Sequence, residues 1–167
     1  MTPPNSRASR KKESVIFADV RLFLKRKKRK RKRNGPPAKG SEGVIFAFGG
    51  VSAGMTFYVA DSKPIFDYNW FDEHYIVKSD KPLPAGEDML RLDFNYDGEG
   101  AGKGGTASIF INNEKVAEGR IQKTVAGRFG IDTFGIGADT GAPVTFDYAP
   151  PFAFNGKIEK VEIELKN

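Results

Sequence analysis

Short alternating segments, separated by glycine, proline, asparagine and aspartate, are the feature that most restricts the fold of this chain. Residues 90–96 read LRLDFNY, in which an apolar side chain takes every second position. Successive side chains of a strand point to opposite faces, so the pattern predicts a strand with one buried and one wet face. Arg91, Asp93 and Asn95 are expected on the wet face. No segment shows the sustained 3.6-residue period of a helix.

Further segments of strand composition occur along the whole chain, at residues 14–24, 43–48, 56–60, 65–69, 74–78, 106–111, 114–121 and 157–165. Asn112-Asn113 separates two of them and suits the positive φ angles of a type I′ hairpin turn. Residues 61–64 predict a second hairpin, with Pro64 closing its turn. About ten short strands at this spacing predict an all-β, antiparallel β-sandwich or jelly roll of the concanavalin and laminin G-like type.

Positive charge is confined to one end of the chain. Residues 1–40 hold 15 Lys and Arg against 2 Asp and Glu, whereas residues 41–167 hold 12 against 19. The net charge of +6 therefore combines a basic segment of +13 with an acidic body of −7. There is no cysteine among the 167 residues, which excludes disulfides, thiol nucleophiles and cysteine-bound metal sites.

The domain prediction places a disordered N-terminus at residues 1–12 and one sandwich at residues 13–167. A basic insertion at residues 24–41 lies between the strand at 14–24 and its expected partner at 43–48. No apolar run approaches the length of a membrane helix, and the first residues lack the apolar core of a signal peptide. The sequence predicts no membrane span, and the cytoplasm is the default compartment.

Nine consecutive cationic residues form the strongest chemical feature of the insertion. This basic run comprises Lys25, Arg26, Lys27, Lys28, Arg29, Lys30, Arg31, Lys32 and Arg33. Lysine and arginine bind polyanions by neutralising phosphates or sulfates and releasing counterions, and binding of this kind does not depend on the sequence of the polyanion. Base-specific recognition needs a recognition helix or interleaved aromatic residues, and the run has neither. The alternative is a tolerated insertion with no binding role.

Three other motifs favour structural interpretations. Residues 93–98 begin like an EF-hand loop, but the twelfth position is Gly104 where a bidentate glutamate belongs. Asp97 and Glu99 are a weaker calcium candidate that we do not adopt. The stretch GEGAGKGG at residues 98–105 lacks the Lys-Ser/Thr and the helix of a phosphate-binding loop. His74, the single histidine, is interpreted as structural because spacing alone gives it no catalytic partner.

Four aromatic residues lie close together in the sequence. They are Tyr68, Trp70, Phe71 and Tyr75. Aromatic side chains on a sandwich stack on sugar rings or dock on a partner, although they more often belong to a core.

The order of motifs from Glu42 to Leu165 resembles the C-terminal β-sandwich domain of large bacterial arylsulfatases. The resemblance rests on EGVIFAFGG, FYVADSKPIFDYNWF, HYIVKSDKPLPAG, FNYDGEGAGKGGTASIFINNEKVAEGRI and DTGAPVTFDYAPPFAFNGKIEKVEIEL. It extends to Val15–Arg21 as a first strand. The chain departs from the family at the basic insertion and at Val51–Gly54, where an Arg-Phe-Gly-Gly type segment is expected.

The resemblance implies a non-catalytic accessory domain that supports or caps a sulfatase active site. Sulfatases use a Cys/Ser-x-Pro-x-Arg motif and a calcium site on a separate catalytic domain. The nearest match here, Ser62-Lys63-Pro64, lacks the arginine, so we expect no catalytic residue, metal ligand or cofactor in this chain. The expected partner is a sulfatase catalytic domain or polypeptide. The alternative is an autonomous polyanion- or polysaccharide-binding sandwich that uses the basic run.

Overall fold

A computed structural model describes residues 20–27, 40–127, 129 and 134–165. They form ten strands, of which β9 has only two residues. The strands are β1 (Val20–Lys27), β2 (Gly43–Gly50), β3 (Ala53–Ala60), β4 (Lys63–Trp70), β5 (Glu73–Lys78), β6 (Asp88–Tyr96), β7 (Gly105–Ile111), β8 (Glu114–Ile121), β9 (Gly135–Ile136) and β10 (Lys157–Leu165). No described residue belongs to a helix, and hence none to a helix long and apolar enough to cross a membrane.

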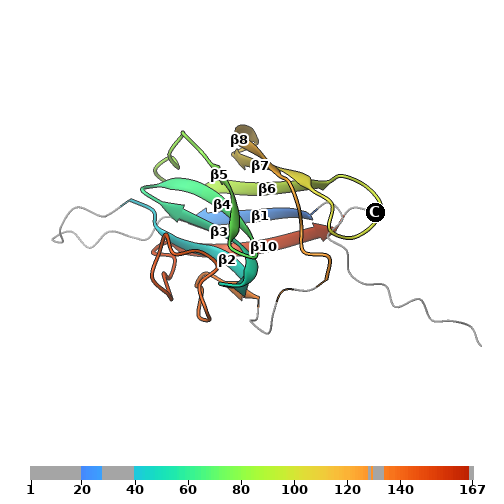
Figure 1. Cartoon of the computed structure of the whole chain (residues 1–167). Coiled ribbons are helices and arrows are strands. Elements are labelled where there is room, and N and C mark those ends of the chain that lie inside the picture. Colours follow the sequence, from blue (N-terminus) through green and yellow to red (C-terminus); the bar gives the residue numbers. More distant parts are fainter. Residues whose placement is uncertain (1–19, 28–39, 128, 130–133, 166–167) are drawn as a thin grey trace, which may run out of the picture.

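Two five-stranded antiparallel sheets pack face to face. Sheet A has the order β10-β1-β6-β7-β8, and sheet B has the order β5-β4-β3-β2-β9. Figure 1 shows β1 between β6 and β10, with the strands of sheet B lying across them. The outer strands β8 and β5 approach closely, since a Cβ on Gly119 of β8 would lie 2.6 Å from Val77 of β5. The predicted antiparallel β-sandwich is confirmed.

The structure corrects one expected strand pairing. β1 pairs with β6 and β10 in sheet A, whereas β2 pairs with β3 and β9 in sheet B. The chain between Lys27 and Gly43 therefore connects the two sheets and does not close a hairpin. Strand composition alone did not reveal this, because pairing depends on which long-range partner completes each buried face.

The inner faces of both sheets form the main core. In β6 the predicted alternation places Leu90, Leu92 and Phe94 in this core, each 7% exposed or less. The other face of β6 is drier than expected, since Asp93 is only 8% exposed and lies 3.2 Å from Nε of Arg91. The arginine covers the carboxylate because both residues lie on the outer face of sheet A, two positions apart on one strand.

Three hairpins use two-residue turns in which both residues have positive φ. Asn112 and Asn113 have φ of 49° and 70°, which confirms the predicted turn. At the β3–β4 hairpin the turn is Asp61-Ser62, and Pro64 lies inside β4 opposite Val59. The prediction that Pro64 closes this turn was wrong. Pro64 is the second residue of β4, close to the strand start where proline is tolerated, and its carbonyl oxygen still accepts a hydrogen bond from the backbone N–H of Ser79 at 3.0 Å.

Residues 139–152 add a third layer on the outer face of sheet B. Val144 and Tyr148 from this layer pack with four sheet residues into a second apolar cluster, and Phe152 packs at its margin. The sheet residues of this outer cluster are Val44, Ala47, Tyr58 and Ile65. The irregular segment rich in glycine, proline and aromatic residues thus covers an outer sheet face that would otherwise be exposed to water.

Candidate functional site

The turn between β4 and β5 presents an aromatic side chain to solvent. Phe71 and Asp72 occupy the two turn positions, with φ of 48° and 69°. Phe71 is 60% exposed and packs edge-on against Trp70, with ring centroids 5.4 Å apart. The backbone N–H of Asp72 donates to Oδ1 of Asn69 at 2.9 Å, which fixes the turn. The hairpin therefore holds Phe71 outward on a rigid support.

Polar groups surround this aromatic turn on one side. Nζ of Lys123 lies 4.3 Å from the Trp70 ring centroid and 3.4 Å from Oε2 of Glu73. The hydroxyl of Tyr75 donates to Oε1 of Glu73 at 2.6 Å, and this hydrogen bond, with Lys123, holds the pKa of Glu73 below its usual value. Burial and the Glu73 carboxylate raise the pKa of Tyr75 to about 12. We call Trp70, Phe71, Glu73, Tyr75 and Lys123 the aromatic tip.

The structure brings together three of the four predicted aromatic residues. Trp70, Phe71 and Tyr75 belong to the aromatic tip, whereas Tyr68 is 4% exposed and lies in the main core. The Tyr68 hydroxyl accepts a hydrogen bond from the backbone N–H of Val125 at 2.9 Å. Tyr68 is therefore unavailable to an external partner. Strand alternation places Tyr68 and Trp70 on the same inward face, and they differ because Trp70 is the last residue of β4.

The tip is better suited to docking than to sugar stacking. The Lys123 ammonium already occupies one face of the Trp70 ring. The Phe71 ring, by contrast, is mostly exposed and held by its turn, so it can enter an apolar pocket without losing much conformational freedom.

The first part of the basic run belongs to sheet A. β1 continues through Lys25 and Arg26, which pair with both β6 and β10, to Lys27, which pairs with β10. The rest of the predicted insertion up to residue 39, including Lys28–Arg33, lies outside the described residues. The run therefore begins on a strand whose backbone is fixed on both sides.

A network of buried polar groups, which was not predicted from the sequence, joins the third layer and sheet B. The Tyr148 hydroxyl donates to Oδ2 of Asp139 at 2.7 Å and lies 3.1 Å from Oγ1 of Thr56. The Tyr58 hydroxyl donates to Oδ2 of Asp147 at 2.9 Å. Burial raises the pKa of both tyrosines far above the usual value. The bonds from Tyr148 to Thr56 and from Tyr58 to Asp147 attach residues 139–152 to sheet B, whereas the bond from Tyr148 to Asp139 lies within the third layer.

His74 and Asp67 form an adjacent pair. Nδ1 of His74 lies 2.9 Å from both carboxylate oxygens of Asp67, which is fully buried, while the histidine side chain is 26% exposed. Burial raises the pKa of Asp67, and the hydrogen bond from His74 opposes that rise. Among the described residues, His74 forms hydrogen bonds with Asp67 alone, and we keep the structural interpretation of this histidine. The contact follows from the β4–β5 register, which sets Asn69 opposite His74 and leaves Asp67 two positions away on the same face of β4.

The remaining candidate motifs have structural partners. Asp97 accepts two hydrogen bonds from Arg120, at 2.8 and 2.6 Å, so its carboxylate is already neutralised by a guanidinium. The Ser62 hydroxyl accepts a hydrogen bond from the backbone N–H of Ser41 at 3.1 Å, as a turn residue does. Within the described ranges there is no group of three or more His, Asp or Glu side chains placed to hold a metal ion.

Comparison with known proteins identifies the fold. The chain matches no family model and no curated protein sequence. Among solved structures it is similar to mouse laminin alpha1 chain domains LG4-5, with a TM-score of 0.59 and 9% identity over 91% of this chain. It is also similar to the LG1-3 region of the laminin alpha2 chain, with a TM-score of 0.60 and 11% identity over 90% of this chain. The chain spans 37% and 28% of the length of these two structures.

The two sheets and the likeness to solved structures define the fold and no more. It is a jelly roll similar to laminin G domains, a sandwich of two antiparallel sheets that carries an exposed aromatic turn and whose first described strand, β1, ends with the first three residues of the basic run. At these identities the likeness describes architecture, and the function must be argued from the surface of this chain.

Proposed function

We propose that this chain is a non-catalytic accessory domain of arylsulfatase type, which supports or caps the active site of a sulfatase. The observation that carries the proposal is the exposed Phe71 at φ 48°. A bulky residue with positive φ is an outlier, and glycine or asparagine would fit the turn with less strain. Strained residues of this kind persist mainly where they serve a function.

Docking on a catalytic partner explains both the exposure and the strain. Interface energy is concentrated in a few aromatic anchors that enter pockets, surrounded by polar groups that exclude water. In the aromatic tip, Phe71 corresponds to the anchor, and Glu73, Tyr75 and Lys123 correspond to the polar surround. The arylsulfatase resemblance supplies the partner, since the sandwich of that family packs on a catalytic domain.

The test is binding to sulfatase chains from the same genome that carry the Cys/Ser-x-Pro-x-Arg motif, measured by calorimetry. Phe71→Asn keeps a residue that favours positive φ and removes the aromatic ring. We expect the variant to fold normally and to bind at least about 30-fold more weakly, as for a hot-spot residue. Phe146→Asn, at another exposed phenylalanine, is the matched control and should bind like the unmodified chain. An unmodified chain that binds no sulfatase, or equal losses in both variants, would contradict the proposal.

A second candidate function is polyanion binding through the basic run. It is favoured by the observation that Lys25 and Arg26 lie on β1 between the paired strands β6 and β10, and that Lys27 still pairs with β10. A fixed strand positions charges at a lower entropic cost than a free chain does. We expect retention on a heparin column that falls steeply with salt, and loss of that retention when residues 28–33 are replaced by glycine and serine. Retention unaffected by this replacement would exclude the run as the binding element.

A further inference from the structure

The edges of the two sheets are not equally protected against pairing with another strand. An edge strand offers a row of backbone N–H and C=O groups, and proteins shield it by a cover, a short strand, proline or inward-pointing charges. In sheet B, β9 has two residues, and β5 at the other edge lies against β8 of sheet A, where Gly119 approaches Val77. β10 is different, because it has nine residues and is the outermost described strand of sheet A.

The second half of β10 has none of these protective features. The register with β1 shifts in a β-bulge just before Lys160 and is regular from there to the end of the strand. In this regular part the charged side chains of Lys160, Glu162 and Glu164 alternate onto the outer face of the sheet. The inward positions hold Val161, which packs against the main core, and Ile163. The strand contains no proline, so its second half can accept another strand.

Apolar side chains are exposed between the two sheets on the same side of the sandwich. β9 and β10 meet there, since a Cβ on Gly137 just after β9 would lie 3.5 Å from Ile158 of β10. Ile163 is 49% exposed although it faces inward, and Phe134 and Ile136 are 40% and 52% exposed. They are three of the six exposed large apolar side chains among the described residues. We call Phe134, Ile136 and Ile163 the open seam.

We propose that the second half of β10 pairs antiparallel with β10 of a second copy of this chain, so that sheet A continues across a two-fold axis. An axis normal to the sheet keeps the outer faces of both copies on one side, and opposed residues must then share a face. With the axis at Val161, Lys160 of each copy lies opposite Glu162 of the other. The contact therefore has two opposite-charge pairs on the outer face and a valine pair on the inner face.

The charges favour this register, and the apolar surface favours a second copy as the partner. An axis at Ile163 would set Glu162 opposite Glu164 twice, and like charges directly opposite destabilise a strand pair. The axis at Val161 also brings the open seams of the two copies together, so exposed apolar area is buried with the strand edge. The interface includes neither Phe71 nor any residue of the basic run, so the inference stands apart from both proposed functions.

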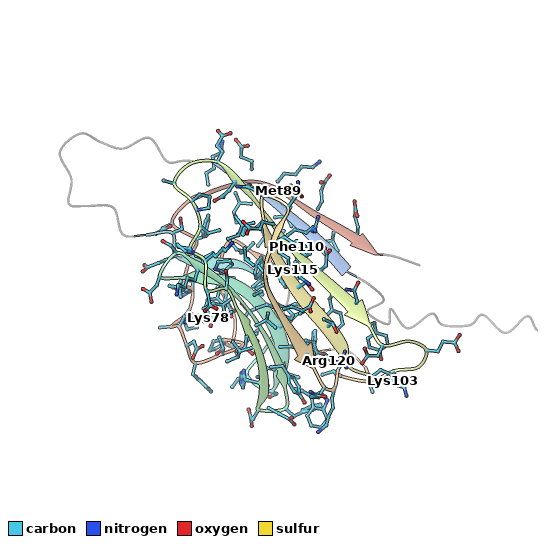
Figure 2. The ribbon with its side chains drawn as sticks, turned by 90° about the horizontal axis from the view of Figure 1, so that it is seen from above. Lys78, Met89, Lys103, Phe110, Lys115 and Arg120 are labelled. Carbon is cyan, nitrogen blue, oxygen red and sulfur yellow. The ribbon has the colours of Figure 1, made fainter. Side chains whose placement is uncertain are left out.

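Sedimentation equilibrium of the full chain over a wide concentration range tests the dimer. Lys160→Glu sets glutamate opposite Glu162 in both pairs and should raise the dissociation constant of the dimer at least about 10-fold. Lys160→Glu/Glu162→Lys exchanges the charges and should restore the original dissociation constant. The control is Lys115→Glu, at an exposed lysine that pairs with Glu118 on β8, the other edge of sheet A; Figure 2 labels this lysine. It should leave the dissociation constant unchanged.

A single cysteine gives a second test of the register. The chain has no cysteine, so Val161→Cys introduces one thiol, which meets its own copy at the proposed axis. Directly opposed residues have Cα atoms about 4.5–5.5 Å apart, a separation that a disulfide can bridge. Mild oxidation should therefore link Val161→Cys chains into covalent dimers. The same substitution at exposed Lys115 should give no such product.

Four results would overturn this inference. The first is a chain that stays monomeric at every concentration. The second is a Lys160→Glu variant that dimerises like the unmodified chain, and the third is a charge exchange that does not restore the dimer. The fourth is a dimer that Phe71→Asn abolishes and Lys160→Glu does not, because the contact would then lie at the aromatic tip. Thermal unfolding of each variant shows that the fold is intact.

Discussion

Removal of one buried hydroxyl tests whether the polar network holds the third layer on sheet B. Tyr148→Phe leaves the ring, which stacks on Phe152 at 5.1 Å and meets Tyr58 edge-on at 5.2 Å. It deletes both hydrogen bonds of the hydroxyl: the 3.1 Å bond to Oγ1 of Thr56, which links the third layer to β3, and the 2.7 Å bond to Asp139, a carboxylate of the layer that is only 3% exposed. The remaining bond to that carboxylate, from the backbone N–H of Val144, is longer at 3.3 Å.

The magnitude follows from the charge on the acceptor. A hydrogen bond to a buried charged group contributes about 1.5–3 kcal/mol, and removal of one partner leaves the other desolvated. We expect Tyr148→Phe to lower the free energy of unfolding by about 2 kcal/mol. For a domain of this size the melting temperature should fall by about 4–8 °C. Urea unfolding, followed by circular dichroism and fitted with a common slope, measures the change.

A matched variant makes the result specific. Tyr75→Phe also removes a hydroxyl bonded to a carboxylate, but Glu73 is exposed and water replaces the lost partner. We expect no measurable change in the free energy of unfolding for Tyr75→Phe. Equal effects of the two substitutions, or a Tyr148→Phe variant as stable as the unmodified chain, would refute the argument that this network anchors residues 139–152.

Three further predictions concern the core, a turn and alkaline pH. Gly54→Ala should lower the free energy of unfolding by about 1–3 kcal/mol, because the new Cβ would lie 2.6 Å from the backbone oxygen of Phe48. The control is Gly127→Ala, whose Cβ would have no atom within 4 Å. In the same urea assay its free energy of unfolding should change by no more than about 0.5 kcal/mol. Asn113 has a φ of 70°, which a β-branched residue adopts only with strain, so Asn113→Val should lower the free energy of unfolding by about 1–2 kcal/mol. Asn113→Gly should leave the free energy of unfolding, measured by thermal unfolding, nearly unchanged. Burial raises the pKa of Tyr68 from 10.0 to about 12, so its contribution to stability is present below pH 10 and is lost as the pH rises through 12. Ultraviolet titration should therefore show that Tyr68 ionises only when the chain unfolds. Tyr68→Phe should move the midpoint of alkaline unfolding to a higher pH. Ionisation of Tyr68 at its usual pKa in the folded chain would contradict this prediction.

The candidate site was predictable where it depended on local sequence. The clustering of Trp70, Phe71 and Tyr75 along one hairpin marked the aromatic tip, and nine successive cations marked the basic run. Lys123, which covers Trp70, was not predictable, because it comes from a segment about 50 residues further along the chain.

The sequence by itself determined that this chain forms strands and where several of them turn. Alternation in residues 90–96 encodes the two faces of a strand, and Asn112-Asn113 tolerates positive φ, so both properties are local. The tertiary structure decided which strands meet: β1 joins β6 and β10, and not β2. It also buried Asp67 of β4 and Asp139 of the third layer. The physical reason is that strand formation depends on neighbouring residues, whereas pairing, bulges and burial depend on how distant segments fill a shared core and satisfy each other's hydrogen bonds.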